Sequence, residues 1–189
     1  MPLRRLGLFG GTFDPPHNGH VAALSAAAAS GRFDVIEVTV AGAPYRKSAL
    51  GAVHSASLRL AMARAAFEHL DLVRVSDREI SRPGPSYTID TVVELLTEVD
   101  EVDVLIGADL VPQLPTWHRA EELRELVAVG VVPRPGAALS TPEGWRCYEI
   151  AMPPVDLSST FLRDTPLDLE ALKLFMPEEV IVIYQGAKE

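Results

Sequence analysis

The chain has 189 residues and a formal net charge of −9, from 17 Lys and Arg against 26 Asp and Glu. Hydrophobic residues make up 48% of it, which is enough for one packed core, so we expect a single domain over residues 1–189. A nucleic-acid surface would show a cluster of basic residues, and the sequence of this acidic chain has none. No stretch approaches the roughly 18 consecutive apolar residues of a membrane span. We therefore expect neither nucleic acid nor a membrane as a partner.

The start of the chain and its cysteine content indicate the compartment. Residues 1–5 are basic, but the apolar run behind them ends at Gly10, which is too short for the core of a signal peptide. The single cysteine, Cys147, cannot form an internal disulfide and has no metal-ligand partners at sequence spacing, which suits a reducing compartment. We therefore expect a soluble, cytoplasmic protein in which Cys147 is a packing residue.

Short apolar runs and helical patterns alternate along the chain. The runs predict strands over 6–9, 35–41, 72–75, 102–106, 127–132 and 146–150. Helical patterns occupy 21–30, 57–70 and 88–99. This alternation predicts an α/β fold, a Rossmann-like, doubly wound and mostly parallel sheet with helices on both faces. Ligands bind such sheets beyond the carboxyl ends of the strands, at the topological switch point.

The last third of the chain is less regular. A loop rich in proline and polar residues is expected from Pro133 to about Pro142, before the strand over 146–150. Residues 179–185 have the β-branched content of a strand, whereas Pro177 suits the first position of a helix. We predict a helix there.

The most informative motif follows the first predicted strand and reads Gly-Gly-Thr-Phe-Asp-Pro-Pro-His-Asn-Gly-His over residues 10–20. Gly10 and Gly11 let the backbone take positive φ and approach a ligand, and the next helix offers unpaired N–H groups and the positive end of its dipole. His17 and His20 lie on nearly one face of that helix, so both can donate to one phosphoryl group. The spacing is neither that of a dinucleotide-binding loop nor that of a Walker loop. The motif predicts chemistry on a nucleotide phosphate.

This motif resembles the signature of the nucleotidyltransferase superfamily. Later segments over 86–91, 107–109, 116–118 and 158–163, in this order and spacing, make nearly the whole chain similar to the bacterial nicotinate-nucleotide adenylyltransferases. The resemblance implies transfer of the adenylyl group of ATP to nicotinate mononucleotide, which gives deamido-NAD and pyrophosphate in NAD biosynthesis. Mg²⁺ is expected on the triphosphate oxygens, with no protein ligand named, because the sequence has no cluster of Asp, His or Cys at metal-ligand spacing.

The resemblance assigns the reacting phosphate to the first motif. It implies that His20 stabilises the α-phosphate in the transition state and that His17 binds the nucleotide phosphates. Such a transfer needs alignment and charge compensation rather than a base, because the acceptor phosphate is already an anion. The ATP-binding set in this motif comprises Gly10, Gly11, Thr12, Phe13, His17 and His20, and Asp14 braces the loop. The competing interpretation is a pair of helix-cap or core histidines.

A second anion site is implied at the start of a predicted helix near residue 158. In the family, residues at the positions of Ser158, Ser159, Thr160 and Arg163 grip the leaving phosphates, and Arg163 joins the two histidines as a catalytic residue. Serine and threonine alone would suit an ordinary N-cap. Lys47 matches a family lysine that serves both nucleotides, although Arg46 precedes it where relatives often carry His or Gln.

The resemblance places the acceptor side at the segments over 86–91 and 116–118. Trp117, otherwise a core or surface aromatic residue, would stack on the pyridine ring, and backbone N–H groups at Thr88 and His118 would receive the nicotinate carboxylate. Thr12 and Lys47 complete the acceptor-binding set. Gly107 and Asp109 would lie against the ribose and adenine of ATP. Arg59 and Arg134 remain open, each as a surface charge or, for Arg134, as a neighbour of the nucleotide.

Other functions stay open at this point. The chain can be an adenylyltransferase for nicotinamide mononucleotide or for another phosphorylated acceptor, such as a pantetheine phosphate. It can also be a non-catalytic nucleotide-binding regulatory module, while a cytidylyltransferase fits less well because its late serine-threonine signature differs. The expected partners are ATP and nicotinate mononucleotide, and a homo-oligomer is neither predicted nor excluded.

Overall fold

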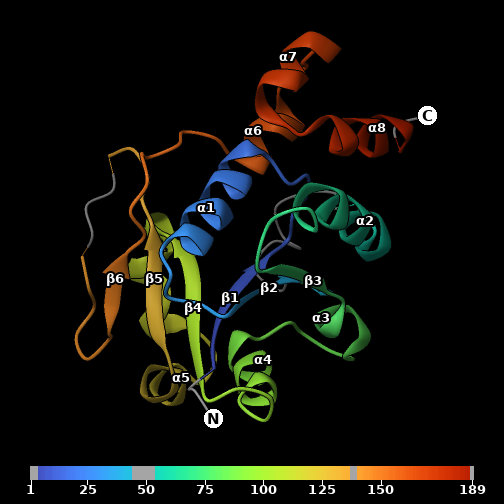
Figure 1. The fold of residues 1–189 in the computed structure, drawn as a ribbon. Coiled ribbons are helices and arrows are strands. Elements are labelled where there is room, and N and C mark those ends of the chain that lie inside the picture. The colour runs from blue at the N-terminus through green and yellow to red at the C-terminus, as the bar shows by residue number, and fades with distance from the viewer. Residues whose placement is uncertain (1–3, 44–53, 137–139, 188–189) are drawn as a thin grey trace.

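The computed structural model describes residues 4–43, 54–136 and 140–187 (Figure 1). Its six-stranded sheet has the order β3-β2-β1-β4-β5-β6, and each neighbouring pair is parallel. The strands are β1 (Arg5–Gly11), β2 (Val35–Val40), β3 (Val73–Ser76), β4 (Glu101–Gly107), β5 (Ala128–Val132) and β6 (Cys147–Glu149). The direction of winding reverses between β1 and β4, as in a doubly wound fold. The predicted Rossmann-like fold is confirmed, with a wholly parallel sheet.

Helices occupy the connections between the strands and the end of the chain. They are α1 (Asn18–Ala29), α2 (Ala56–Phe67), α3 (Arg78–Ser81), α4 (Thr88–Leu95), the 3₁₀ helix η1 (Ala108–Thr116), α5 (Ala120–Leu126), α6 (Ser159–Asp164), α7 (Leu169–Phe175) and α8 (Glu178–Gly186). Residues 179–185 lie within α8, so the choice of helix over strand is confirmed. The predicted helices over 57–70 and 88–99 end earlier, at Phe67 and Leu95.

Two apolar clusters cover the two faces of the sheet. Successive residues of one strand point to opposite faces, so Leu8 and Phe9 belong to different clusters, as do Val104 and Leu105. The cluster that contains Phe9 is closed by α1, α2 and α8, and the one that contains Leu8 is closed by α4, η1 and α5. In the described residues, a cavity remains at the carboxyl ends of the strands, where the loops that follow them begin.

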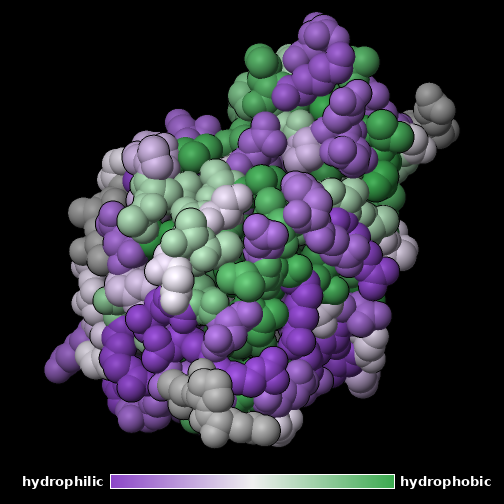
Figure 2. All heavy atoms as spheres, viewed as in Figure 1, coloured by the Kyte–Doolittle hydropathy of each residue, from purple (hydrophilic) through white to green (hydrophobic). Residues whose placement is uncertain are grey.

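The C-terminal helices stand at one end of the sheet, beside the start of α1 (Figure 1). Apolar side chains reach the surface there, including Leu169 and Leu174, while hydrophilic residues cover the lower part of the face in Figure 2, where α4 and α5 lie. In the described ranges, no helix is long and apolar enough to cross a bilayer.

Candidate active site

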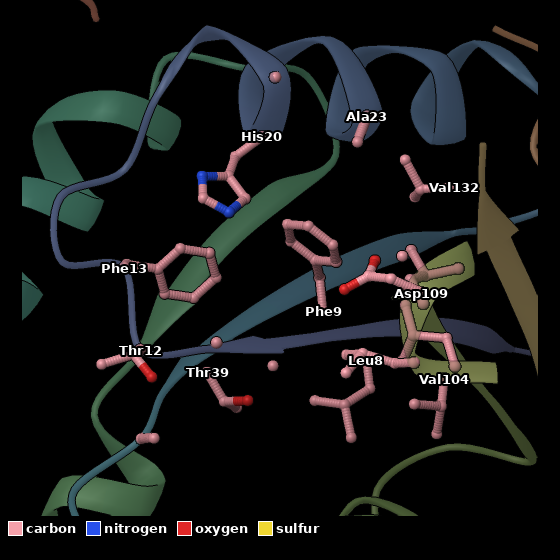
Figure 3. A pocket seen from close by; sticks show the side chains of 18 of the residues that line it. Leu8, Phe9, Thr12, Phe13, His20, Ala23, Thr39, Val104, Asp109 and Val132 are labelled. Atoms are coloured by element: carbon pink, nitrogen blue, oxygen red, sulfur yellow. The ribbon is translucent and has the colours of Figure 1, made fainter. Parts of the chain in front are cut away.

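A cavity of about 480 Å³ opens at the carboxyl ends of β1 and β4, the switch point of the sheet (Figure 3). Its volume is within the range of small-molecule sites. Many of the predicted site residues line it, although they are far apart in sequence. These are Gly10, Gly11, Thr12, Phe13, His17, His20, Thr88, Gly107, Asp109, Trp117 and Ser159. The fold thus brings the first motif, the segments over 86–91, 107–109 and 116–118, and the start of α6 to one place.

The loop after β1 makes a tight turn at Phe13. This residue has φ of 49°, in the left-handed region that side chains other than glycine rarely adopt. Its ring folds back over Gly11, where a Cβ atom would lie 2.7 Å from the ring. The ring of Phe13 also meets that of His20 edge-on, at 5.2 Å between centroids. Gly11 is therefore required for this packing, and Phe13 forms one wall beside His20.

The two histidines stack at the start of α1, with 3.7 Å between ring centroids. The Nδ1 atom of His20 accepts a hydrogen bond from the backbone N–H of His17 at 3.2 Å. The proton of the neutral His20 ring must then be on Nε2, which makes that nitrogen a donor. His17 is buried against Gly19, where a Cβ atom would lie 3.1 Å from its ring. The glycine of the His-Asn-Gly-His motif is needed for that fit.

A buried carboxylate, that of Asp14, braces the loop through hydrogen bonds to His54. The Asp14 carboxylate is fully buried and lies 2.6 Å from His54 Nδ1, and it also accepts from the backbone N–H of His54 at 3.2 Å. This agrees with the interpretation of Asp14 as a brace. Arg59 is 2% exposed, so it is not the surface charge that the sequence allowed. Its guanidinium donates to the carbonyl oxygen of Thr12 on the same loop. Burial lowers the pKa of its guanidinium, and the negative charge of Asp14 opposes that shift.

Helix α6 docks onto the same loop. The hydroxyl of Ser159 donates to the carbonyl oxygen of Pro15 at 2.8 Å, and the guanidinium of Arg163 donates to that of Asp14 at 2.5 Å. Ser158 caps the helix by accepting from the N–H of Phe161. Ser158, Thr160 and Arg163 do not line the cavity, but they stand on the short helix that borders it.

The opposite wall comes from α4 and η1. Thr88 is the first residue of α4, and Trp117 follows η1. The indole of Trp117 is half-buried, and its Nε1 atom is buried without a hydrogen-bond partner in the described part of the chain. His118 is exposed and stacks on Tyr87 at 4.0 Å between ring centroids, outside the cavity lining. The hydroxyl of Ser86 accepts from the backbone N–H of Gly42 at 2.9 Å, which ties this wall to the end of β2.

Asp109 projects into the cavity from the end of β4 (Figure 3). Its carboxylate lies over Gly107, where a Cβ atom would be 2.5 Å from Oδ1 of Asp109. The same Oδ1 atom lies 3.7 Å from Nε of Arg134. Arg134 itself lines the cavity and donates to the carbonyl oxygen of Leu157 at 2.6 Å. Arg134 is therefore placed at the cavity, and its position beside the nucleotide stays a prediction. Lys47 and Arg46 lie outside the described residues.

Thr39 and Glu79 are among the cavity residues that no sequence motif indicates. Thr39 pairs with Gly10 in the β1–β2 register, and its hydroxyl is buried without a hydrogen-bond partner in the parts of the chain that are described. Glu79, on the four-residue helix α3, accepts from the hydroxyl of Thr91 at 2.8 Å. Strand pairing could have pointed to Thr39, but a helix as short as α3 has no periodicity to detect.

Three comparisons identify the relatives of this chain. A family model described as cytidylyltransferase-like matches residues 8–165. The chain is 38% identical to a protein of Exiguobacterium sibiricum and 34% identical to one of Bacillus mycoides, both named "Probable nicotinate-nucleotide adenylyltransferase". The first alignment covers 93% of each chain and the second 95% of each.

The fold is also similar to that of a solved structure, Plasmodium falciparum nicotinic acid mononucleotide adenylyltransferase complexed with NaAD. The TM-score is 0.80 at 16% identity, over 98% of this chain and 96% of that one. At that identity the likeness concerns the fold, whereas the sequence matches above concern descent. The chain therefore belongs to the cytidylyltransferase-like family, in the branch of the nicotinate-nucleotide adenylyltransferases.

Proposed function

We propose that this protein transfers the adenylyl group of ATP to nicotinate mononucleotide, which forms nicotinate adenine dinucleotide and pyrophosphate in NAD biosynthesis. One observation carries the proposal: a single cavity joins the histidine-lined start of α1 to the wall formed by Thr88 and Trp117. A dinucleotide product needs such continuity, because its two halves are linked through the reacting phosphates. The names of the relatives support the same activity.

The chemistry proposed at the histidines is an in-line displacement. An oxygen of the acceptor phosphate forms a bond to the α-phosphorus of ATP while the bond to the bridging β-oxygen breaks, and pyrophosphate leaves with that electron pair. His20 Nε2–H donates to the α-phosphate as its charge grows, and His17 and the backbone from Gly10 to Phe13 hold the phosphates. No base is needed, since the attacking phosphate is an anion.

The leaving phosphates are assigned to α6. Ser158 is the N-cap of this helix, and Ser159 and Thr160 begin its first turn, where backbone N–H groups favour an anion. Arg163, in the last turn of the same short helix, adds a guanidinium. The bonds of Ser159 and Arg163 to the phosphate loop fix this helix relative to the histidines. The two anion sites are therefore held at a constant separation, as an extended triphosphate requires.

The nucleosides are assigned to opposite ends of the cavity. We place the ribose of ATP against Gly107 and Asp109, whose carboxylate accepts from a ribose hydroxyl while Arg134 fixes its orientation. We place the pyridine ring on the face of Trp117 and its carboxylate at the N–H groups of Thr88 and His118. Thr12 and Lys47 complete the acceptor side, Lys47 lying outside the described residues.

Mg²⁺ is proposed as an ion carried by the nucleotide. In the parts of the chain that are described, no group of three or more His, Cys, Asp or Glu side chains is placed to hold a metal. The acidic side chains of the cavity lie against protein partners, Asp109 against Arg134 and Glu79 against Thr91. These donors fit an ion held mainly by triphosphate oxygens and water, which would neutralise part of the charge on the leaving pyrophosphate.

The proposal predicts a preference for the acid over the amide acceptor. A pocket that offers only N–H donors favours a carboxylate, whereas a carboxamide turns its own NH₂ toward one of them. Pyrophosphate release should be measured with ATP and, in parallel, nicotinate mononucleotide, nicotinamide mononucleotide and phosphopantetheine. We expect the highest kcat/KM for nicotinate mononucleotide. Equal or reversed preference would assign the protein to the nicotinamide branch. If the protein binds ATP but releases no pyrophosphate with any of the three acceptors, it is a non-catalytic nucleotide-binding module.

Trp117→Ala should act on the acceptor and spare ATP. Stacking of a base on an aromatic side chain is worth roughly 1–3 kcal/mol, and a single pyridine ring belongs at the low end, so KM for the acceptor should rise about fivefold to tenfold. Steady-state kinetics with each substrate varied in turn measures this. Trp117→Phe is the matched control because it keeps an aromatic face, so KM for the acceptor should rise less in that variant. A rise in KM for ATP alone would contradict the placement of the pyridine ring.

A further inference from the structure

Arg59 lies on α2, outside the lining of the cavity, yet its guanidinium is buried and binds three carbonyl oxygens. Nη1 donates to Thr12 at 3.0 Å, Nε to His54 at 3.0 Å and Nη2 to Gly42 at 3.4 Å. We infer that Arg59 is a positioning residue for catalysis, which holds the left-handed turn at Phe13 through the Thr12 carbonyl and so sets the place of the His20 ring. This inference rests on the proposed function of His20.

The burial of Arg59 needs a reason beyond the anchoring of α2. A guanidinium that is 2% exposed has given up its hydration, and an apolar side chain of similar size would fill the space at lower cost. The nearby carboxylate of Asp14 is already bonded to His54. What the guanidinium supplies instead is a planar fork of donors, which reaches carbonyl groups on the phosphate loop, after β2 and before α2.

The bond to Thr12 determines the direction of the next peptide N–H. In a trans peptide the carbonyl and the following N–H point in opposite directions. With the Thr12 carbonyl bonded to Arg59, the N–H of Phe13 must therefore point away from α2. The left-handed φ of 49° at Phe13 is unfavourable for a residue with a side chain, so it persists only when its surroundings hold it. The Arg59–Thr12 bond is one such constraint.

The turn at Phe13 also determines where the Phe13 ring lies against His20. The Phe13 ring packs edge-on against His20 at 5.2 Å and against Phe67, a residue of α2, at 5.4 Å between centroids. Figure 3 shows the rings of Phe13 and His20 beside each other at the cavity. A change in the Thr12–Phe13 peptide would move this ring and with it one side of the pocket that holds the imidazole.

Arg59→Lys tests the inference, with Arg64→Lys as the matched control. A lysine keeps the charge but cannot reach three carbonyl groups at once. Arg64 is on the same helix, half exposed and paired with Glu68 at 3.5 Å. In the ligand-free protein, the NMR resonances of the His20 ring should shift in Arg59→Lys, because they report the nearby Phe13 ring, and stay in place in Arg64→Lys. Amide resonances of β5, remote from α2 in the sheet order, should not move in either variant.

Kinetics supplies the second readout. Misplacement of a catalytic group by about 1 Å can cost roughly 10²-fold, so kcat of Arg59→Lys should fall by up to that factor while KM for the acceptor changes little. Unchanged His20 resonances together with an unchanged kcat would overturn the inference. If Arg59→Lys fails to fold, Arg59→Gln decides by the same two readouts, because an amide side chain still offers donors but cannot bind all three carbonyl oxygens. Should the wild-type protein release no pyrophosphate, the proposed function fails, while the His20 resonances still test the positioning.

Discussion

His20→Ala is expected to lower kcat by roughly 10²–10³-fold, or about 3–4 kcal/mol, with the fold intact. The imidazole is partly exposed at the first turn of α1, so its removal leaves the apolar cores in place. What is lost is the Nε2–H donor, whose position is fixed by the bond from the His17 N–H to Nδ1. A donor aimed at charge that grows in the transition state contributes mainly to kcat, so KM for ATP should change much less.

Single-turnover and steady-state assays of pyrophosphate release measure this effect. His69→Ala is a suitable control, because His69 is exposed and is not among the residues that line the cavity. It should leave kcat unchanged. A folded His20→Ala variant with turnover near that of the wild type would refute the catalytic assignment, and His20 would then be a residue that only caps α1.

The parts of the fold that follow from local sequence were predictable. Each apolar run had a period or length that fitted a buried strand, and the double glycine after the first run fixed where the chain must turn toward a ligand. The 3₁₀ helix η1 was missed because Pro112 and Pro115 within it are ordinarily signs of a loop. The helix over 179–185 was predicted because Pro177 and the family resemblance together outweighed the β-branched residues.

The site residues that share one motif could be predicted from the sequence. The site residues whose partners are distant in the sequence could not. Arg59 and Arg134 look like surface charges in the sequence because nothing near them in the chain is acidic or catalytic. Arg59 donates to the backbone carbonyl of Thr12 and Arg134 to that of Leu157, and a backbone carbonyl cannot be recognised from residue type. The one acidic partner of Arg134 described above, Asp109, is distant in sequence. Thr39 reaches the cavity only through the parallel pairing of β1 with β2.

Arg163→Ala should damage the use of ATP rather than of the acceptor. The loss of one charged donor at the leaving phosphates corresponds to about 10²-fold in kcat/KM for ATP, or about 2.7 kcal/mol, at the low end for such groups. KM for nicotinate mononucleotide should stay close to its wild-type value, because the acceptor wall is built from α4 and η1. Varying each substrate at saturation of the other separates the two effects.

A second cause must be distinguished, because Arg163 also donates to the carbonyl oxygen of Asp14 and so docks α6 onto the phosphate loop. Ser159→Ala removes the parallel bond to Pro15 without removing a charge. If docking dominates, Ser159→Ala should reproduce much of the Arg163→Ala loss, whereas Arg163→Lys should recover little. If charge dominates, Arg163→Lys should recover a large share of kcat/KM for ATP, since an ammonium group still attracts the leaving pyrophosphate although it cannot bind two partners in one plane. An Arg163→Ala variant with unchanged kcat and unchanged KM for ATP would remove Arg163 from the site and leave it as a helix charge that holds α6 to the loop.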